Sequence, residues 1–148
     1  MKMENEVQMN AIQDPTNNET TSADVSKSNE NPLKKIKHVA KGWGYERWIV
    51  NCSEYCGKLL YFEKGKKCSW HYHKIKDEVF YLQSGKMLVK YSDFDDLETS
   101  NEVLLTPGDA FHVYRGLRHQ MIALEDSELF EFSTQHFDSD SFRIVKGD

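Results

Sequence analysis

Short apolar runs that end in turn residues fill the chain after residue 37, and this pattern limits the fold more than any other feature. The runs recur at intervals that suit strands, and no long stretch has the period of an amphipathic helix. Glycine and proline residues mark many of the breaks between them. Strands are predicted at residues 47–51, 57–63, 67–73, 78–83, 86–91, 102–106, 110–114, 119–124, 129–134 and 142–145. The sequence therefore predicts an all-β protein, folded as an antiparallel sandwich or barrel.

Residues 1–32 have a different composition from the rest of the chain. They include no aromatic residue, and their six acidic residues and two lysines give a net charge of −4. Such a segment buries too little apolar surface to offset the entropy that is lost on ordering. We therefore expect a disordered acidic tail at residues 1–32, followed by a single domain at residues 33–148.

Length, charge and apolar patterning argue against several classes of protein. A chain of 148 residues suits one domain, and its net charge of −5 argues against nucleic acid as a partner. No apolar run is long enough to cross a bilayer, and the first residues lack the features of a secretory signal or a transit peptide. The three cysteines form no C-x-x-C pair, which fits free thiols in a reducing compartment. We expect a soluble, cytoplasmic protein with no membrane partner.

Side chains that can bind a metal are concentrated at residues 71–78. Successive side chains of a strand point to opposite faces, so His71 and His73 share one face, about 6.6 Å apart along the strand. Two imidazoles at this spacing can converge on one ion. Glu78 is expected to add a carboxylate from an adjacent strand, and His119 a third imidazole. Burying these four groups in one interior would be costly without an ion.

The spacing of these residues resembles the two motifs of the cupin superfamily, which are small β-barrels that bind a metal inside. The first motif is matched by Gly65, His71, His73, Glu78 and Gly85. The second is matched by Pro107, Gly108, Asp109, Gly116 and His119, with Tyr114 where a proline is usual and Met121 and Ile122 near a common asparagine position. These departures concern the shape of a loop and leave the ligand positions intact. The resemblance covers roughly residues 42–134.

The resemblance implies a cupin-type double-stranded β-helix, or jelly-roll, barrel. It also implies that one divalent transition-metal ion is bound by His71, His73, Glu78 and His119. Three imidazoles and one carboxylate suit Mn²⁺, Fe²⁺, Ni²⁺ or Zn²⁺, and an octahedral ion would keep two positions open for water or substrate.

The strand face opposite the ligands carries Trp70 and Tyr72, and Val79 and Tyr81 are expected to continue this face on the next strand. An exposed face of that composition would be an association surface. Because cupins commonly pair, a homodimer is expected. The alternative is a second buried layer within one chain.

Two further side chains are candidates for roles in the site. Arg115, which with Arg118 flanks the turn before the third histidine, is a candidate for binding a substrate carboxylate or phosphate, although loop arginines are more often solvated. Glu131 is a candidate catalytic base if it faces inward, in which case Phe130 and Phe132 face outward. Structural roles are expected for Cys68, His38, His112 and His136.

Two shorter stretches resemble cupin domains that handle phosphorylated sugars. Residues 41–48, KGWGYERW, are similar to the WGY segment of mannose-6-phosphate isomerase and mannose-1-phosphate guanylyltransferase cupins, and residues 131–144 resemble the closing segment of sugar-processing cupins. The resemblance implies a metal-dependent isomerase of carbohydrate metabolism that acts on a phosphorylated hexose. Two alternatives stay open: a non-haem iron dioxygenase, and a non-catalytic module that binds a metal, a sugar or a small acid.

Overall fold

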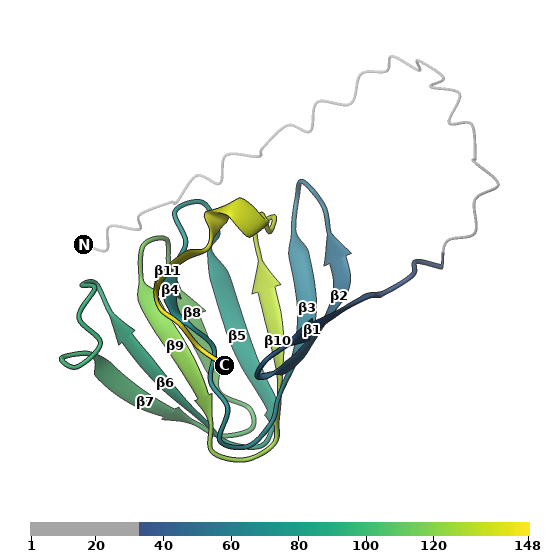
Figure 1. Ribbon diagram of the computed structural model, residues 1–148. Helices are drawn as coiled ribbons and strands as arrows, with labels where there is room; N and C mark the ends of the chain where they lie inside the picture. The colour runs from purple at the N-terminus through teal and green to yellow at the C-terminus, as the bar shows by residue number, and fades with distance from the viewer. Residues whose placement is uncertain (1–32) are drawn as a thin grey trace, which may run out of the picture. The chain divides into compact units, whose positions relative to one another are not determined.

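Eleven β-strands and one 3₁₀ turn make up residues 33–148, the part of the chain that the computed structural model describes (Figure 1). The strands are β1 (Lys37–Lys41), β2 (Gly44–Asn51), β3 (Cys56–Phe62), β4 (Trp70–Tyr72), β5 (Glu78–Ser84), β6 (Met87–Ser92), β7 (Asn101–Leu105), β8 (Ala110–Val113), β9 (Arg118–Ala123), β10 (Ser127–Ser133) and β11 (Phe142–Val145). The 3₁₀ turn, η1 (Asp138–Asp140), precedes the last strand. The tail predicted at residues 1–32 lies outside the described residues. Within residues 33–148, no helix has the length and hydropathy needed to span a bilayer.

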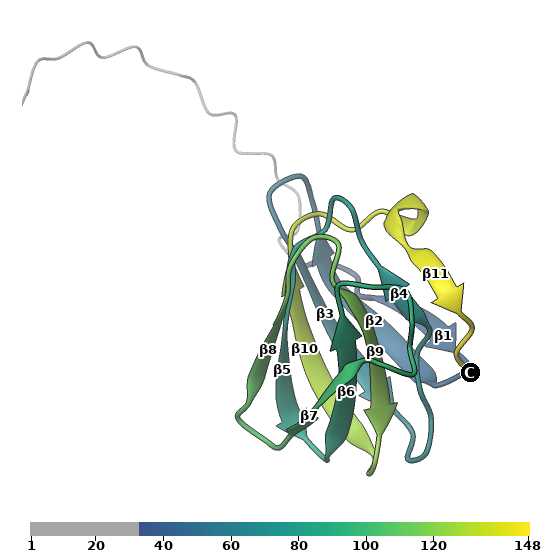
Figure 2. The ribbon, with the colours of Figure 1, turned by 90° about the vertical axis from the view of Figure 1, so that its left-hand side faces the viewer.

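The strands form two antiparallel sheets that face each other. Sheet A has six strands in the order β1-β2-β3-β10-β5-β8, and sheet B has five in the order β11-β4-β9-β6-β7. Figure 1 shows the two sheets drawn together at one end, and Figure 2 shows β4 and β11 side by side at the margin of sheet B. The predicted all-β jelly-roll fold is therefore confirmed.

Each of the ten predicted strand segments overlaps a strand of the structure, and one strand was missed. The missed strand is β1, whose sequence KHVAK carries lysines at both ends and pairs only with β2, at the edge of sheet A. Charged residues are common on edge strands because they discourage pairing with other chains. A pattern that relies on apolar alternation does not detect such a strand.

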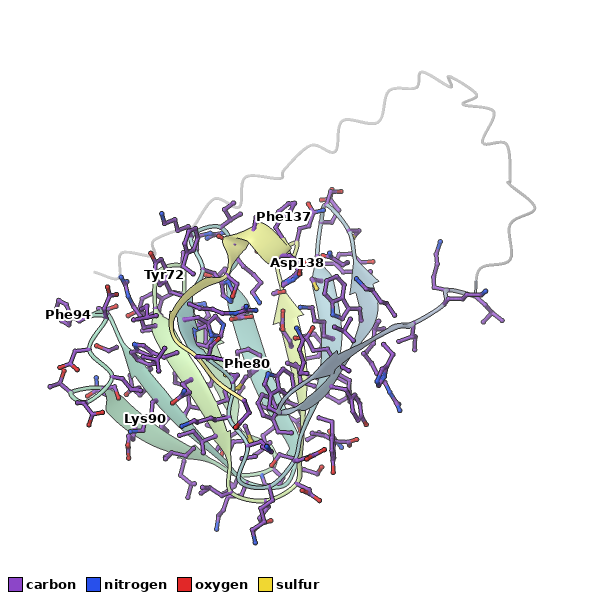
Figure 3. The ribbon with its side chains drawn as sticks, in the orientation of Figure 1. Tyr72, Phe80, Lys90, Phe94, Phe137 and Asp138 are labelled. Carbon is purple, nitrogen blue, oxygen red and sulfur yellow. The ribbon has the colours of Figure 1, made fainter. Side chains whose placement is uncertain are left out.

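The core lies between the two sheets. Strand β3 shows how it forms, because alternate residues from Cys56 to Phe62 are buried. Leu60 and Phe62 meet Leu82 of the same sheet and Met87 of the other in one apolar cluster. Figure 3 shows Phe80 between the sheets, where only 3% of its surface is exposed. Each side chain of this size contributes about 1.5–3 kcal/mol when fully buried.

Two motif glycines adopt backbone conformations that other residues rarely adopt. Gly65 and Gly85 have φ angles of +82° and +88°. A Cβ atom at Gly85 would lie 2.3 Å from the backbone oxygen of Asp126, whereas a Cβ atom at Gly65 would meet nothing within 4 Å. The turn between β5 and β6 therefore requires glycine for both its backbone angle and its close packing.

The aromatic face expected opposite the ligands does not form as one surface, because β4 belongs to sheet B and β5 to sheet A. Trp70 is fully buried, and its indole N–H donates to the backbone carbonyl of Asp95 over 2.7 Å. Tyr72 stacks on Phe142 of β11, with ring centroids 5.1 Å apart. The buried-layer alternative therefore holds for Trp70, whereas Tyr72 is only half-buried beside its cross-strand neighbour, and the homodimer remains a prediction.

Candidate metal centre and cavity

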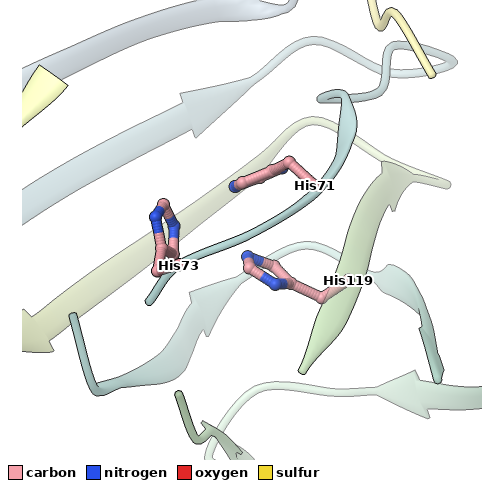
Figure 4. Close-up of side chains that lie close together, drawn as sticks. All are labelled: His71, His73 and His119. Atoms are coloured by element: carbon pink, nitrogen blue, oxygen red, sulfur yellow. The ribbon is translucent and has the colours of Figure 1, made fainter. Parts of the chain in front are cut away.

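Three histidines from two neighbouring strands of sheet B converge inside the barrel. His71 lies on β4, His73 follows it directly, and His119 on β9 is the cross-strand partner of His71. Their potential ligand nitrogens all lie within 4.8 Å of one another. Figure 4 shows the three rings gathered around a common space. The structure thus brings together the three imidazoles that the sequence analysis selected.

Backbone carbonyl groups determine which ring nitrogen carries the hydrogen in each of the three histidines. The Nδ1 of His71 lies 2.8 Å from the Ser69 carbonyl oxygen, that of His73 lies 2.7 Å from that of Asp140, and that of His119 lies 3.1 Å from that of Leu117. A carbonyl oxygen can only accept, so each Nδ1 carries the hydrogen and donates it. Each Nε2 of a neutral ring is then a lone pair, which is the form that binds a metal.

Burial keeps two of these rings neutral. Desolvation is the main reason why the pKa of His71 lies well below its usual value, and the neighbouring His119 and His73 act in the same direction. Desolvation, followed by the positive charge of Lys76, lowers the pKa of His73 to about 4. These two imidazoles are therefore unprotonated and able to coordinate a cation at neutral pH.

Glu78 brings a carboxylate to the cluster from the opposite sheet, rather than from an adjacent strand as expected. Its Oε1 lies 3.4 Å from Nε2 of His73 and 3.3 Å from Nε2 of His119. Its Oε2 forms an ion pair with the ammonium of Lys76. Burial opposes ionisation of Glu78, but Lys76 and the histidines outweigh this and hold its pKa well below the usual range.

The groups at this position fit a divalent transition-metal ion. Oε1 of Glu78 is buried, has no hydrogen-bond donor among residues 33–148, and faces the Nε2 lone pairs of His73 and His119. Such an atom is costly unless an ion or a ligand completes it. Lone pairs from imidazole nitrogen and carboxylate oxygen suit Mn²⁺, Fe²⁺, Ni²⁺ or Zn²⁺. His71, His73 and His119 could bind a metal, and Glu78 is positioned to add a fourth ligand.

A cavity of about 480 Å³ opens next to the cluster. His71, His73, Glu78 and His119 line it, and so do Leu60, Phe62, Phe80 and Met121. Its remaining polar lining includes Glu46, Lys58, Lys76, Glu131 and His136. This volume is sufficient for a small organic molecule.

Buried residues of alternating charge follow the inner face of sheet A from the histidine cluster. The Lys76 ammonium donates to Glu131 over 3.0 Å. Lys58 lies 3.7 Å from Glu131 and 3.7 Å from Glu46, and Lys41 lies 3.3 Å from Glu46. We call Glu46, Lys58, Glu131 and His136 the Lys58 wall.

Glu131, the candidate base, faces the cavity and is 3% exposed. By the alternation of a strand, Phe130 and Phe132 point to the other side of sheet A, where they stack with centroids 6.2 Å apart. Phe132 is 57% exposed. The sequence left the orientation of Glu131 open, and the structure places it inward.

Arg115 does not reach the cavity. Its Nε–H donates to the backbone carbonyl of Ile75 over 2.7 Å, and its side chain is 56% exposed. Arg118 pairs with Asp95 at 2.7 Å. Two cations that the sequence analysis missed, Arg143 and Lys146, do line the cavity. Arg143 is the cross-strand partner of His71, a relationship that follows from the pairing of β4 with β11 and not from local sequence.

Cys68 packs in the core, as expected of a structural residue. Its Sγ accepts a hydrogen bond from the backbone N–H of Met121 over 3.2 Å. Burial raises the pKa of this thiol to about 12, so it is not a nucleophile at neutral pH. It faces the interior although it precedes His71 by three residues, because regular strand geometry begins only at Trp70.

This two-sheet barrel with a histidine cluster inside is the architecture of a cupin, and a family comparison agrees. The family model described as "Cupin domain" matches residues 58–132. The match spans just over half of the chain and includes all four residues proposed as ligands. The chain belongs to the cupin family. A comparison with curated proteins gave no match.

Solved structures with the same fold are distant in sequence. The capsular polysaccharide assembling protein CapF from Staphylococcus aureus aligns with a TM-score of 0.67 at 15% identity, over 78% of this chain and 33% of CapF. KdgF from Halomonas sp. aligns with a TM-score of 0.60 at 20% identity, over 72% of this chain and 90% of KdgF. A single-residue variant of oxalate decarboxylase from Bacillus subtilis aligns with a TM-score of 0.63 at 20% identity, over 73% of this chain and 30% of that enzyme.

These likenesses show a shared fold. The part of CapF that aligns with this chain is about a third of the CapF length. Oxalate decarboxylase from Bacillus subtilis has Mn(II) centres.

Proposed function

We propose that the chain is a metal-dependent enzyme of the isomerase type that acts on a phosphorylated hexose. One observation carries the proposal: the cavity beside the histidine cluster also holds a buried carboxylate, Glu131, paired with the Lys76 ammonium at 3.0 Å. Moving a proton between adjacent carbons requires an electrophile and a base in one water-poor site. Both requirements can be met by residues that line this cavity.

His71, His73, His119 and Glu78 would hold the ion. A bound divalent ion would supply Lewis-acid polarisation of a substrate oxygen. Lys76 would hold the second oxygen of Glu78 by the ion pair that is already present, as outer-sphere partners of metal ligands commonly do.

Glu131 would accept a proton from the substrate carbon and return it to the neighbouring carbon. It lies between the ammonium groups of Lys76 and Lys58, at 3.0 Å and 3.7 Å, which fix its position in the cavity. Its burial excludes bulk water, which would otherwise exchange the proton or compete for it.

The phosphate of the substrate would bind near Arg143 and Lys146. Both side chains line the cavity and are exposed, and no ion-pair partner is found for either among residues 33–148. A phosphate that bridges two cations gains charge-assisted hydrogen bonds. This assignment replaces Arg115, which the Ile75 carbonyl holds outside the cavity.

Metal analysis and an anaerobic assay test the proposal together. Protein purified without added metal should contain close to one transition-metal ion per chain. The loaded protein should interconvert mannose 6-phosphate and fructose 6-phosphate without oxygen. Glu131→Gln should keep the metal and lose turnover, because the amide cannot accept the proton. Full turnover in this variant would contradict the role of Glu131.

Other outcomes would point to the alternative functions. Consumption of O₂ after reconstitution with Fe²⁺ would favour a non-haem dioxygenase. Tight binding of metal or sugar without turnover on any hexose phosphate would favour a binding module.

A further inference from the structure

The cavity contains a buried nitrogen that the proposed chemistry does not use. His136 lines the cavity, and its Nδ1 is buried without a hydrogen-bond partner among the described residues. Its Nε2 lies 3.1 Å from the carboxylate of Asp138. An ionised carboxylate only accepts, so Nε2 carries the hydrogen and Nδ1 is a lone pair. A buried acceptor without a donor is costly, and a donor from a bound molecule would remove that cost.

Burial also keeps this ring neutral. Desolvation and the positive charge of Lys58 lower the pKa of His136, although its contact with Asp138 acts in the opposite direction. Nδ1 is therefore available as an acceptor at neutral pH.

Lys58 supplies donors next to this acceptor. Its side chain is 1% exposed, and its ammonium lies 3.7 Å from Glu46 and 3.7 Å from Glu131. These separations exceed the usual N–H···O hydrogen-bond range of about 2.7–3.2 Å. The carboxylates balance the charge of Lys58, but at these distances they leave its N–H groups able to bind a ligand oxygen.

Trp48 contacts three of the four residues of the Lys58 wall. Its indole N–H donates to Glu46 over 2.7 Å, and its ring lies 4.6 Å from the Lys58 ammonium. The ring of His136 packs edge-on against it with centroids 4.8 Å apart. These contacts fix the acceptor and donor positions before any ligand binds, which lowers the entropy cost of binding.

We propose that the Lys58 wall is a second binding subsite, which recognises uncharged hydroxyl groups on the carbon chain of the substrate. The inference deepens the proposed function and rests on it for the other end of the substrate. A hydroxyl group both donates and accepts, so neighbouring hydroxyls can satisfy Nδ1 of His136, the Lys58 ammonium and the carboxylates together.

The same wall disfavours an anionic group. The ammonium groups here are balanced by carboxylates, so a phosphate would bury additional negative charge without a net positive charge to compensate it. The phosphate end of a sugar phosphate is therefore directed away from the Lys58 wall, and the hydroxylated carbons toward it. This arrangement would select polyhydroxylated substrates over short phosphorylated acids.

Nuclear magnetic resonance of the metal-loaded full chain tests the inference directly. Millimolar D-mannose, D-fructose and D-mannitol are added separately, and the ring resonances of His136 are followed with inorganic phosphate as the comparison. At least one of the three polyols should shift the His136 resonances, and phosphate should not. His136→Phe, which keeps the ring packed on Trp48, should weaken polyol binding about tenfold. Lys58→Met should weaken it by at least as much.

Two measurements separate this inference from the proposed function. Metal content should be unchanged in His136→Phe, and His112→Phe, at a surface histidine outside the cavity lining, should bind the polyols like the native chain. Polyol binding without isomerase turnover would support the subsite and count against the reaction. Unshifted His136 resonances with all three polyols, or equal affinity in His136→Phe, would overturn the subsite even if turnover were found.

Discussion

His73 donates its Nδ1 hydrogen to the backbone carbonyl of Asp140 over 2.7 Å, and the side chain of the same aspartate holds the loop that follows His73. The Asp140 carboxylate accepts hydrogen bonds of 2.8–3.1 Å from the backbone N–H groups of residues 74–76. One residue on η1 therefore orients a candidate ligand and fixes the path of the chain toward Glu78.

Replacing Asp140 should weaken metal binding without removing a ligand. Asp140→Ala releases three backbone N–H groups and loosens the carbonyl that orients His73, and changes to such outer partners typically cost about 10–100-fold in metal affinity. Competition with a fluorescent chelator measures this affinity. Asp96→Ala is the matched control, because Asp96 also accepts from a backbone N–H but lies on the surface. Equal affinity in the two variants would contradict the role of Asp140.

Removing a single ligand should remove the ion. His73→Ala should lower bound metal from about one ion per chain to below a tenth, because two imidazoles and a carboxylate hold a transition metal far more weakly. Plasma mass spectrometry of the dialysed proteins gives the content. His136→Ala should retain full metal, since His136 is not part of the histidine cluster. The ligand assignment fails if both variants contain the same amount.

Lys76 should be essential for stability, although lysine side chains are usually exposed and contribute little. Its ammonium neutralises two buried carboxylates, and these carboxylates raise its pKa despite burial. Lys76→Met leaves Glu78 without an ion-pair partner and Glu131 with only the more distant Lys58, and should reduce the free energy of unfolding by about 3–5 kcal/mol. Lys66→Met, at a side chain that is 42% exposed, should change it by less than about 0.5 kcal/mol. Urea titration compares them, and similar losses would refute the argument.

Metal-free protein should lose stability as the pH falls from 6.5 to 5. The unfolded chain protonates His73 near pH 6.5, but the native pKa is about 4, so the unfolded state binds more protons in this range. For His73 alone the loss is about 1.5 kcal/mol by pH 5, and His71 adds to it because its pKa is also lowered. Urea unfolding at several pH values measures the slope. A flat profile in native protein, or an equal slope in His73→Phe, would contradict this explanation.

The two motif glycines should differ in their tolerance of alanine. Gly65→Ala should cost only the strain of a positive φ, about 1–2 kcal/mol. Gly85→Ala adds a clash with the backbone of residues 126–127 and should cost roughly 1–3 kcal/mol more. Thermal unfolding of both variants gives the comparison. Equal losses would mean that the turn between β5 and β6 moves to accept a side chain.

The fold and the histidine cluster could be predicted because both depend on strand alternation. The period of two placed His71 and His73 on one face, and the resemblance to the second cupin motif added His119. Alternation does not say which sheet a strand enters. Glu78 was therefore expected on an adjacent strand, although it approaches the cluster from the facing sheet.

The Lys58 wall could not be recognised by residue type alone, because a lysine in a strand normally points to solvent. A usable signal was present: Lys58 shares its face with Leu60 and Phe62, and all three are buried. The role of His136 depends on its contact with Trp48 and its place in the cavity lining, and no local pattern encodes these contacts. The same limitation hid Arg143, which only the pairing of β11 with β4 brings beside His71.

The carbonyl groups that accept from the three histidines belong to the main chain, and two of them lie just two residues before the ring they orient. No side-chain replacement deletes such an acceptor. The surrounding sequence can therefore diverge widely while the same ring nitrogens remain free to coordinate. The path of the backbone therefore keeps these ring nitrogens available to a metal. The side chains of the cavity wall can change for new substrates without affecting them.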